Sequence, residues 1–249
     1  MRKRRKVRKR LYMVIAFLVI SLSIFLAKIL QDGSADALNL PVMRHEDAAS
    51  DTNPEKRPVV CLDPGHGGHD VGGEGKGIFE KDVNLKIGLQ VGKLLEKNDY
   101  TILYTRTTDK ANGDTQKEDV RARCDISNNA GADIYVSLHC NIDKASAKSR
   151  GVELWCRFPN QKGEELAKSL DKQLAQVGYT KDRGLRYESD GGLYVLQNTK
   201  AVAALVELGF LSNAEDRAFL NSEQGQAKCA AAIAKGIEEY INANFHQKK

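Results

Sequence analysis

Two histidines each stand where an apolar stretch of the sequence ends. His66 lies in the Gly-rich segment that follows residues 59–62, and His139 follows residues 134–138. Glu80 stands at the expected start of the first long helix. Two imidazoles and one carboxylate, with a fourth position left for water, are a common ligand set for catalytic zinc. The three residues are therefore candidate metal ligands, although an acid such as Glu80 also favours a helix N-terminus without any metal.

Glu207 is a fourth candidate because it interrupts the apolar residues 204–208. Burying a carboxylate without a partner is costly, so something must compensate it. One possibility is an attacking water, which would make Glu207 the general base and later the acid that protonates the departing amine. The other possibility is a structural salt bridge, for instance to an Arg. These residues alone leave both open.

His69 and Cys140 lie beside the two histidines and suggest other chemistry. His69 follows His66 by three residues, but that spacing fixes no ligand geometry in a Gly-rich loop. Cys140 directly follows His139 and could form a thiol nucleophile. A His that binds zinc cannot also serve as the base for that thiol. We therefore expect neither residue to belong to the reacting set.

Short apolar runs alternate with longer stretches of helical periodicity after residue 58, which is typical of crossover units. The predicted fold class is α/β: a single domain with a central, mostly parallel sheet flanked by helices. In such a sheet His66 and His139 would converge at the carboxyl edge. Thr115 and Glu118 form a capping-box pattern. Strands are expected at residues 59–62, 101–104, 134–138, 152–155, 194–196 and 204–208, and helices at 80–97, 115–130, around 166–174 and at 223–242.

The N-terminal region predicts one transmembrane helix ahead of this domain. Residues 1–10 form a basic tail that should stay in the cytoplasm, and residues 11–30 are apolar and long enough to span a bilayer. Residues 31–57 are typical of a linker, and residues 58–249 form the exported domain. A cleaved secretory signal is the alternative, with small residues at 35–37 as its cleavage site. Both interpretations place the domain outside the cytoplasm, and retention predicts a single-pass protein of the cell membrane.

Charge and cysteine usage exclude other classes of protein. Eight of the 38 basic residues lie in the first ten positions, which leaves 30 basic against 33 acidic residues in the rest of the chain. That balance does not favour nucleic acid as a partner. The five cysteines are odd in number and show no CxxC spacing. We expect most of them to be small buried residues and none to form a structural disulfide.

Several ordered motifs together resemble the zinc-dependent N-acetylmuramoyl-L-alanine amidases of the type 3 amidase family. The resemblance covers residues 59–241. Cys140 departs from the small residue common in the family, and residues 201–203 lack its frequent Pro. Neither departure removes a ligand. The motifs are DPGHGG at 63–68, GIFEKDVNL around Glu80, Thr105-Arg106 with Asp109, SLHCN at 137–141, Asp182-Arg183-Gly184 and VELGFLSN at 206–213.

The resemblance implies hydrolysis of the amide bond between N-acetylmuramic acid and L-alanine in peptidoglycan. It assigns one Zn²⁺ per chain to His66, Glu80 and His139, and the catalytic role to Glu207. Zinc would lower the pKa of its water from 15.7 toward about 7 while this glutamate takes the proton. Asn141 and Arg183 are candidate substrate contacts, although the first could only cap a strand end and the second could only pair with an acid.

Two other functions remain open at this point. One is a membrane-anchored wall-binding or regulatory module with little activity, and the other is a zinc hydrolase of a different peptidoglycan amide. The biological setting could be wall remodelling, cell separation or spore cortex maturation, with or without a protein activator. Some relatives carry a regulatory helix that blocks the site, but residues 142–150 are too short and polar for one, so we expect an open cleft.

Overall fold

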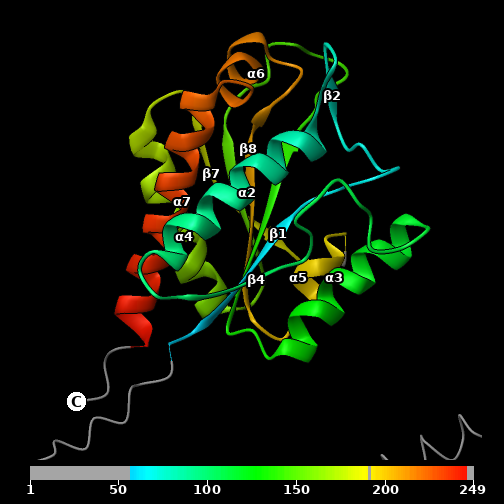
Figure 1. The fold of residues 1–249 in the computed structure, drawn as a ribbon. Helices are drawn as coiled ribbons and strands as arrows, with labels where there is room; N and C mark the ends of the chain where they lie inside the picture. The colour runs from blue at the N-terminus through cyan, green and yellow to red at the C-terminus, as the bar shows by residue number, and fades with distance from the viewer. Residues whose placement is uncertain (1–56, 190–191, 246–249) are drawn as a thin grey trace, which may run out of the picture. The chain divides into compact units, whose positions relative to one another are not determined.

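Six strands form one mixed sheet in the order β4-β1-β5-β8-β6-β7. The computed structural model describes residues 57–189 and 192–245 (Figure 1). Four of the five strand pairings are parallel, and β6 runs antiparallel to β8. The predicted α/β class is confirmed, with a sheet that reverses direction once. The strands are β1 Val59–Pro64, β4 Thr101–Tyr104, β5 Ile134–Asn141, β6 Val152–Arg157, β7 Asp182–Glu188 and β8 Val202–Phe210.

Helices cover both faces of this sheet (Figure 1). One face packs against α2, α4 and α7, and the other against α3 and α5. A short hairpin of β2 and β3 precedes α2, and α6 lies between β8 and α7. The bounds are β2 Glu74–Gly75, β3 Ile78–Phe79, α2 Glu80–Glu96, α3 Gln116–Ala130, α4 Gln161–Val177, α5 Tyr194–Asn198, α6 Ala214–Leu220 and α7 Glu223–Asn244.

Alternation along the central strands explains the two layers. Val60 and Leu62 of β1 belong to the core beneath α2, α4 and α7, whereas Cys61 between them belongs to the core beneath α3 and α5. Successive side chains of a strand point to opposite faces of the sheet. A strand that is covered on both faces therefore has a continuous run of apolar residues in its sequence. This double burial produces the apolar runs seen in the sequence.

Local signals predicted the ends of α2, α3 and α7 to within two residues. Thr115 caps α3 and Glu118 completes the capping box, as predicted. The strand expected at 194–196 is wrong, because these residues belong to helix α5, where Val195 and Leu196 pack into the core. A short apolar run does not distinguish a strand from a buried helical turn. Strand β7 and helix α6 were not predicted.

The segments predicted as a basic tail at 1–10 and a membrane span at 11–30, and most of the predicted linker at 31–57, lie outside the described residues. Within the part of the chain that the structure describes, no helix is both long enough and apolar enough to cross a membrane. All five cysteines are buried and free of disulfides, as expected.

Leu170 tests the packing of α4 against the sheet and α7. Its side chain is fully buried, so replacing it with Ala removes apolar contacts and leaves a cavity. We expect Leu170→Ala to lower the free energy of unfolding by about 2–5 kcal/mol, measured by urea denaturation. Lys168→Ala is the control on the same helix, since this side chain is 61% exposed. Equal effects of the two variants would contradict the packing assignment.

Candidate metal centre and active site

His66, Glu80 and His139 come together at one edge of the sheet. Their ligand atoms all lie within 4.8 Å of one another. Glu80 Oε1 lies 3.2 Å from His66 Nε2 and 2.9 Å from His139 Nδ1. The two imidazole rings meet edge to face, with centroids 4.9 Å apart. The structure thus unites the three residues that the sequence offered as metal ligands.

The sheet positions the second histidine. β5 continues to Asn141, so His139 lies within the strand rather than after it, directly opposite Glu207 of β8. Both side chains point to the face covered by α3 and α5, because they alternate with Leu138 and Leu208 of the opposite core. Cys140 also belongs to that opposite core. Its thiol therefore points away from the site, and burial raises its pKa well above the usual value.

Glu80 is the first residue of α2, but its carboxylate does not cap the helix. Oε2 accepts a hydrogen bond from Gly73 N at 2.6 Å, and Oε1 accepts one from Cys140 N at 2.9 Å. Burial opposes ionisation of this carboxyl, yet its contacts with His139 and His66 hold the pKa well below its usual range. Glu80 is therefore a buried, ionised carboxylate aimed at two imidazoles.

His66 is oriented by a carboxylate that the sequence did not single out. Asp70 Oδ2 lies 2.8 Å from His66 Nδ1, and Asp70 Oδ1 accepts from Gly72 N at 3.1 Å. This contact fixes the ring so that Nε2 faces Glu80. Metal-binding histidines commonly donate their other ring nitrogen to a carboxylate in this way. The four-residue spacing between His66 and Asp70 was the available signal, but loop spacing alone does not show a contact.

Glu207 has no compensating cation. Its Oε2 is buried and has no hydrogen-bond partner, and it takes part in no ion pair within the described residues. No arginine of residues 57–189 and 192–245 forms the salt bridge that the sequence left open. Burial raises the pKa of Glu207 to about 7, and the charges of Glu80 and Glu153 add to the rise while His139 opposes it. A carboxyl with such a pKa can accept and return a proton near neutral pH.

Two cavities meet at this cluster. One has a volume of about 410 Å³ and extends along the start of α3 and residues 192–195. The other has a volume of about 630 Å³ and extends between residues 71–74 and 141–144. Both are lined by His66, His139 and Glu207. A bond held at the cluster could therefore carry one substituent into each cavity.

The two expected substrate contacts differ in position. Asn141 lines the larger cavity, and its Nδ2 donates to Glu153 Oε2 at 3.4 Å. Arg183 lines neither cavity; its Nε donates to Glu153 Oε1 at 2.5 Å, which is the pairing with an acid considered above. His69 is exposed and lies outside the ligand cluster, as expected.

Buried charges lie close to the candidate ligands. Asp63, at the end of β1, accepts from Thr105, Ser137 and Arg123. Arg123 of α3 and Asp119 form a second buried ion pair at 2.6 Å. Sequence reasoning assigned these residues no role, because Asp119 and Arg123 show only the i, i+4 spacing of an ordinary helix pair.

Comparisons with known proteins show which family the chain resembles. Residues 60–239 match the Amidase_3 model, described as N-acetylmuramoyl-L-alanine amidase. The germination-specific N-acetylmuramoyl-L-alanine amidase of Bacillus subtilis is 32% identical over 192 residues, which cover 74% of this chain and 79% of that protein.

Two solved structures extend the similarity to the fold. An N-acetylmuramoyl-L-alanine amidase from Clostridium difficile 630 shares 30% identity, with a TM-score of 0.68 over 76% of this chain and 99% of its own. The CwlD amidase of Clostridioides difficile, solved in complex with the GerS lipoprotein, shares 31% identity, with a TM-score of 0.70 over 76% of this chain and 100% of its own. The chain belongs to the Amidase_3 family and is an N-acetylmuramoyl-L-alanine amidase.

Proposed function

We propose that this amidase uses one zinc ion, held by His66, Glu80 and His139, to hydrolyse the bond between N-acetylmuramic acid and L-alanine. The observation that carries the proposal is a three-residue ligand cluster beside the buried, unpartnered carboxylate oxygen of Glu207. The proposed localisation is extracytoplasmic, where peptidoglycan lies, with residues 11–30 as a membrane anchor.

The residues fit zinc in type and separation. Two imidazole nitrogens and one carboxylate oxygen match the protein ligands of catalytic zinc sites. Bonds of about 2.0–2.2 Å place neighbouring ligand atoms of a tetrahedral ion roughly 3.3 Å apart. The separations of 2.9 and 3.2 Å around Glu80 Oε1 are close to that value. When bound, zinc would supply Lewis-acid polarisation of the carbonyl and would lower the pKa of an attacking water.

The chain's own residues then move the protons. Glu207 accepts a proton from the water whose oxygen forms a bond to the lactyl carbonyl carbon. As the carbon–nitrogen bond breaks, Glu207 returns that proton to the nitrogen of L-alanine, which leaves as a free amine. Asp70 keeps the His66 ring in one orientation throughout. Burial of Glu207 suits both transfers because it raises the pKa of this carboxyl to about 7, near neutral pH.

The two cavities suit a branched substrate such as peptidoglycan, in which the scissile amide joins a glycan to a peptide. We propose Asn141 as a substrate contact in the larger cavity. Arg183 shares the Glu153 carboxylate with Asn141, which favours a role in orienting that contact. The complex of the related CwlD amidase with the GerS lipoprotein favours an accessory protein for this chain too, in the vegetative wall or the spore.

Zinc dependence is testable with the full chain and purified peptidoglycan. We expect a chelator to stop the release of peptides with a new N-terminal Ala, and added zinc to restore it, because no residue of the cluster replaces the metal's charge. Released peptides are identified by mass spectrometry. Release of a different peptide end would indicate another amide bond, and full activity in the chelated protein would contradict the zinc proposal.

Glu207→Gln tests the proton transfers. The amide keeps the size of the side chain but cannot accept the proton, so kcat/KM should fall by about 10²–10⁴-fold while zinc content stays at one per chain. Turnover is measured with a soluble muropeptide, and zinc by atomic emission. The matched control is Glu215→Gln, at a carboxylate that is 71% exposed, and its turnover should equal that of the parent protein. Normal turnover of zinc-loaded Glu207→Gln would overturn the assignment.

Asp70→Asn tests the orientation of His66. The amide weakens the contact with Nδ1, so zinc affinity should fall by about 10–100-fold. Affinity is measured by competition with a chromophoric chelator. His69→Ala, in the same loop but exposed, should leave it unchanged. An effect of equal size in both variants would show that the loop responds to any substitution.

A further inference from the structure

His66 has a backbone conformation that few residues adopt. Its φ is 62°, in the left-handed region, and it is not a glycine. This conformation is strained for a residue with a side chain, and it persists only where the surroundings fix it. From this backbone position His66 Nε2 lies 3.2 Å from Glu80 Oε1. Whatever holds the main chain of His66 therefore also places its imidazole.

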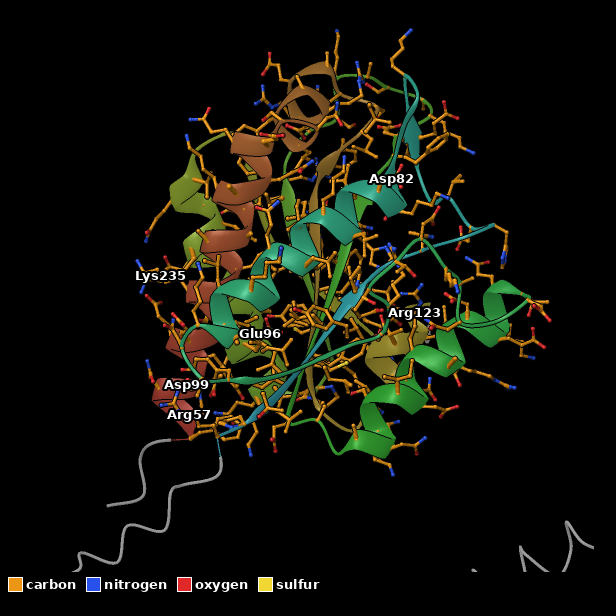
Figure 2. The ribbon with its side chains drawn as sticks, in the orientation of Figure 1. Arg57, Asp82, Glu96, Asp99, Arg123 and Lys235 are labelled. Carbon is orange, nitrogen blue, oxygen red and sulfur yellow. The ribbon has the colours of Figure 1, made fainter. Side chains whose placement is uncertain are left out.

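The guanidinium of Arg123 donates hydrogen bonds to this part of the main chain. Arg123 Nη2 donates to His66 O at 2.7 Å, and Nη1 donates to Pro64 O at 2.8 Å. The side chain of Arg123, labelled in Figure 2, extends from α3 and is 2% exposed. The planar group thus bonds the carbonyl before the Gly65 turn and the carbonyl of the histidine itself.

Arg123 is itself fixed by two carboxylates. Its Nη1 lies 2.7 Å from Asp63 Oδ1, and its Nε lies 2.6 Å from Asp119 Oδ2. All three side chains are at most 3% exposed. Although burial opposes a charge, the two carboxylates raise the pKa of Arg123 above its usual range. The group is therefore a permanently charged fork with little freedom to move.

A second buried arginine binds a different set of main-chain carbonyls. Arg106 donates to Pro64 O, Gly65 O, Lys81 O and Thr108 O, but not to His66 O. Arg106 therefore holds the turn and its neighbours, whereas Arg123 alone, among the described hydrogen bonds, reaches the carbonyl of the histidine.

We propose that Arg123 is a positioning residue for zinc binding, which acts through the main chain of His66. This inference rests on the proposed role of His66 as a zinc ligand. The planar guanidinium is essential to this positioning role. A lysine ammonium is a point charge and cannot contact Asp63, Asp119 and two carbonyls in one plane. Loss of the fork should let His66 leave its strained conformation and weaken the metal site, even where the protein stays folded.

The test compares Arg123→Lys with the parent in the full chain, using zinc competition with a chromophoric chelator. We expect zinc affinity to fall by about 10–100-fold, the range typical of residues that orient a ligand. The matched control is Arg217→Lys. Arg217 Nη1 also donates to a loop carbonyl, Leu211 O at 2.8 Å, but it contacts no ligand. This control should bind zinc like the parent, even if its thermal stability falls as much.

A His66→Ala background separates positioning from general stability. If Arg123 acts through His66, then Arg123→Lys should not change the residual zinc affinity of His66→Ala. A further loss in that background, or parent-like affinity of Arg123→Lys alone, would overturn the inference. If His66→Ala binds zinc like the parent, the proposed ligand set fails instead, so the two failures are distinguishable.

Asp119→Asn provides a milder variant should Arg123→Lys not fold. The amide keeps the shape of Asp119 but weakens its hold on Arg123 Nε. We expect a several-fold loss of zinc affinity that again disappears in the His66→Ala background. A folded Asp119→Asn protein with unchanged zinc affinity would count against the proposal.

Discussion

The contact of the Glu80 carboxylate with two imidazoles joins three distant parts of the chain, and the site depends on it. The carboxylate lies at the first residue of α2, and that helix is docked by Val83 and Ile87 in the core. The same oxygen accepts the Cys140 amide of β5. Helix docking and strand pairing thus place Glu80 Oε1 within hydrogen-bond distance of both His139 and the Cys140 amide. Core packing is in this sense part of the proposed metal centre.

Buried charges support this arrangement from below. Replacing a buried ion pair with apolar side chains of similar volume is often neutral or stabilising. Stability alone therefore does not explain why Asp63, Asp119 and Arg123 are buried together. Apolar side chains could not donate to the carbonyls of Pro64 and His66, however. The charged group is better understood as a support for the loop than as a contribution to the core.

Sequence reasoning identified the residues of the cluster because each one breaks a regular pattern. His66, His139 and Glu207 are polar residues at or near the ends of apolar strands, and parallel pairing brings such ends to one edge. The order of the motifs along the chain indicated the family.

The rest could not be predicted because it depends on tertiary contacts. Residues 194–196 form a helical turn, since packing against the sheet and α3 decides their conformation. The roles of Asp70 and Arg123 depend on which way a loop and a helix face the site, and spacing along the chain does not specify that. The direction of β6 likewise follows from its pairing with β8 rather than from its own residues.

The reversal of strand direction at β6 affects how the active site can diverge among related proteins. Because β6 is antiparallel to β8, the connection between Asn141 and Val152 leaves and re-enters the sheet at the same edge, beside the larger cavity. Added length there would rise over the cavity without changing strand order, either core or any ligand, since loop closure tolerates insertions well. Access to the site can therefore evolve independently of its chemistry, and in this chain the connection is a short loop without a helix.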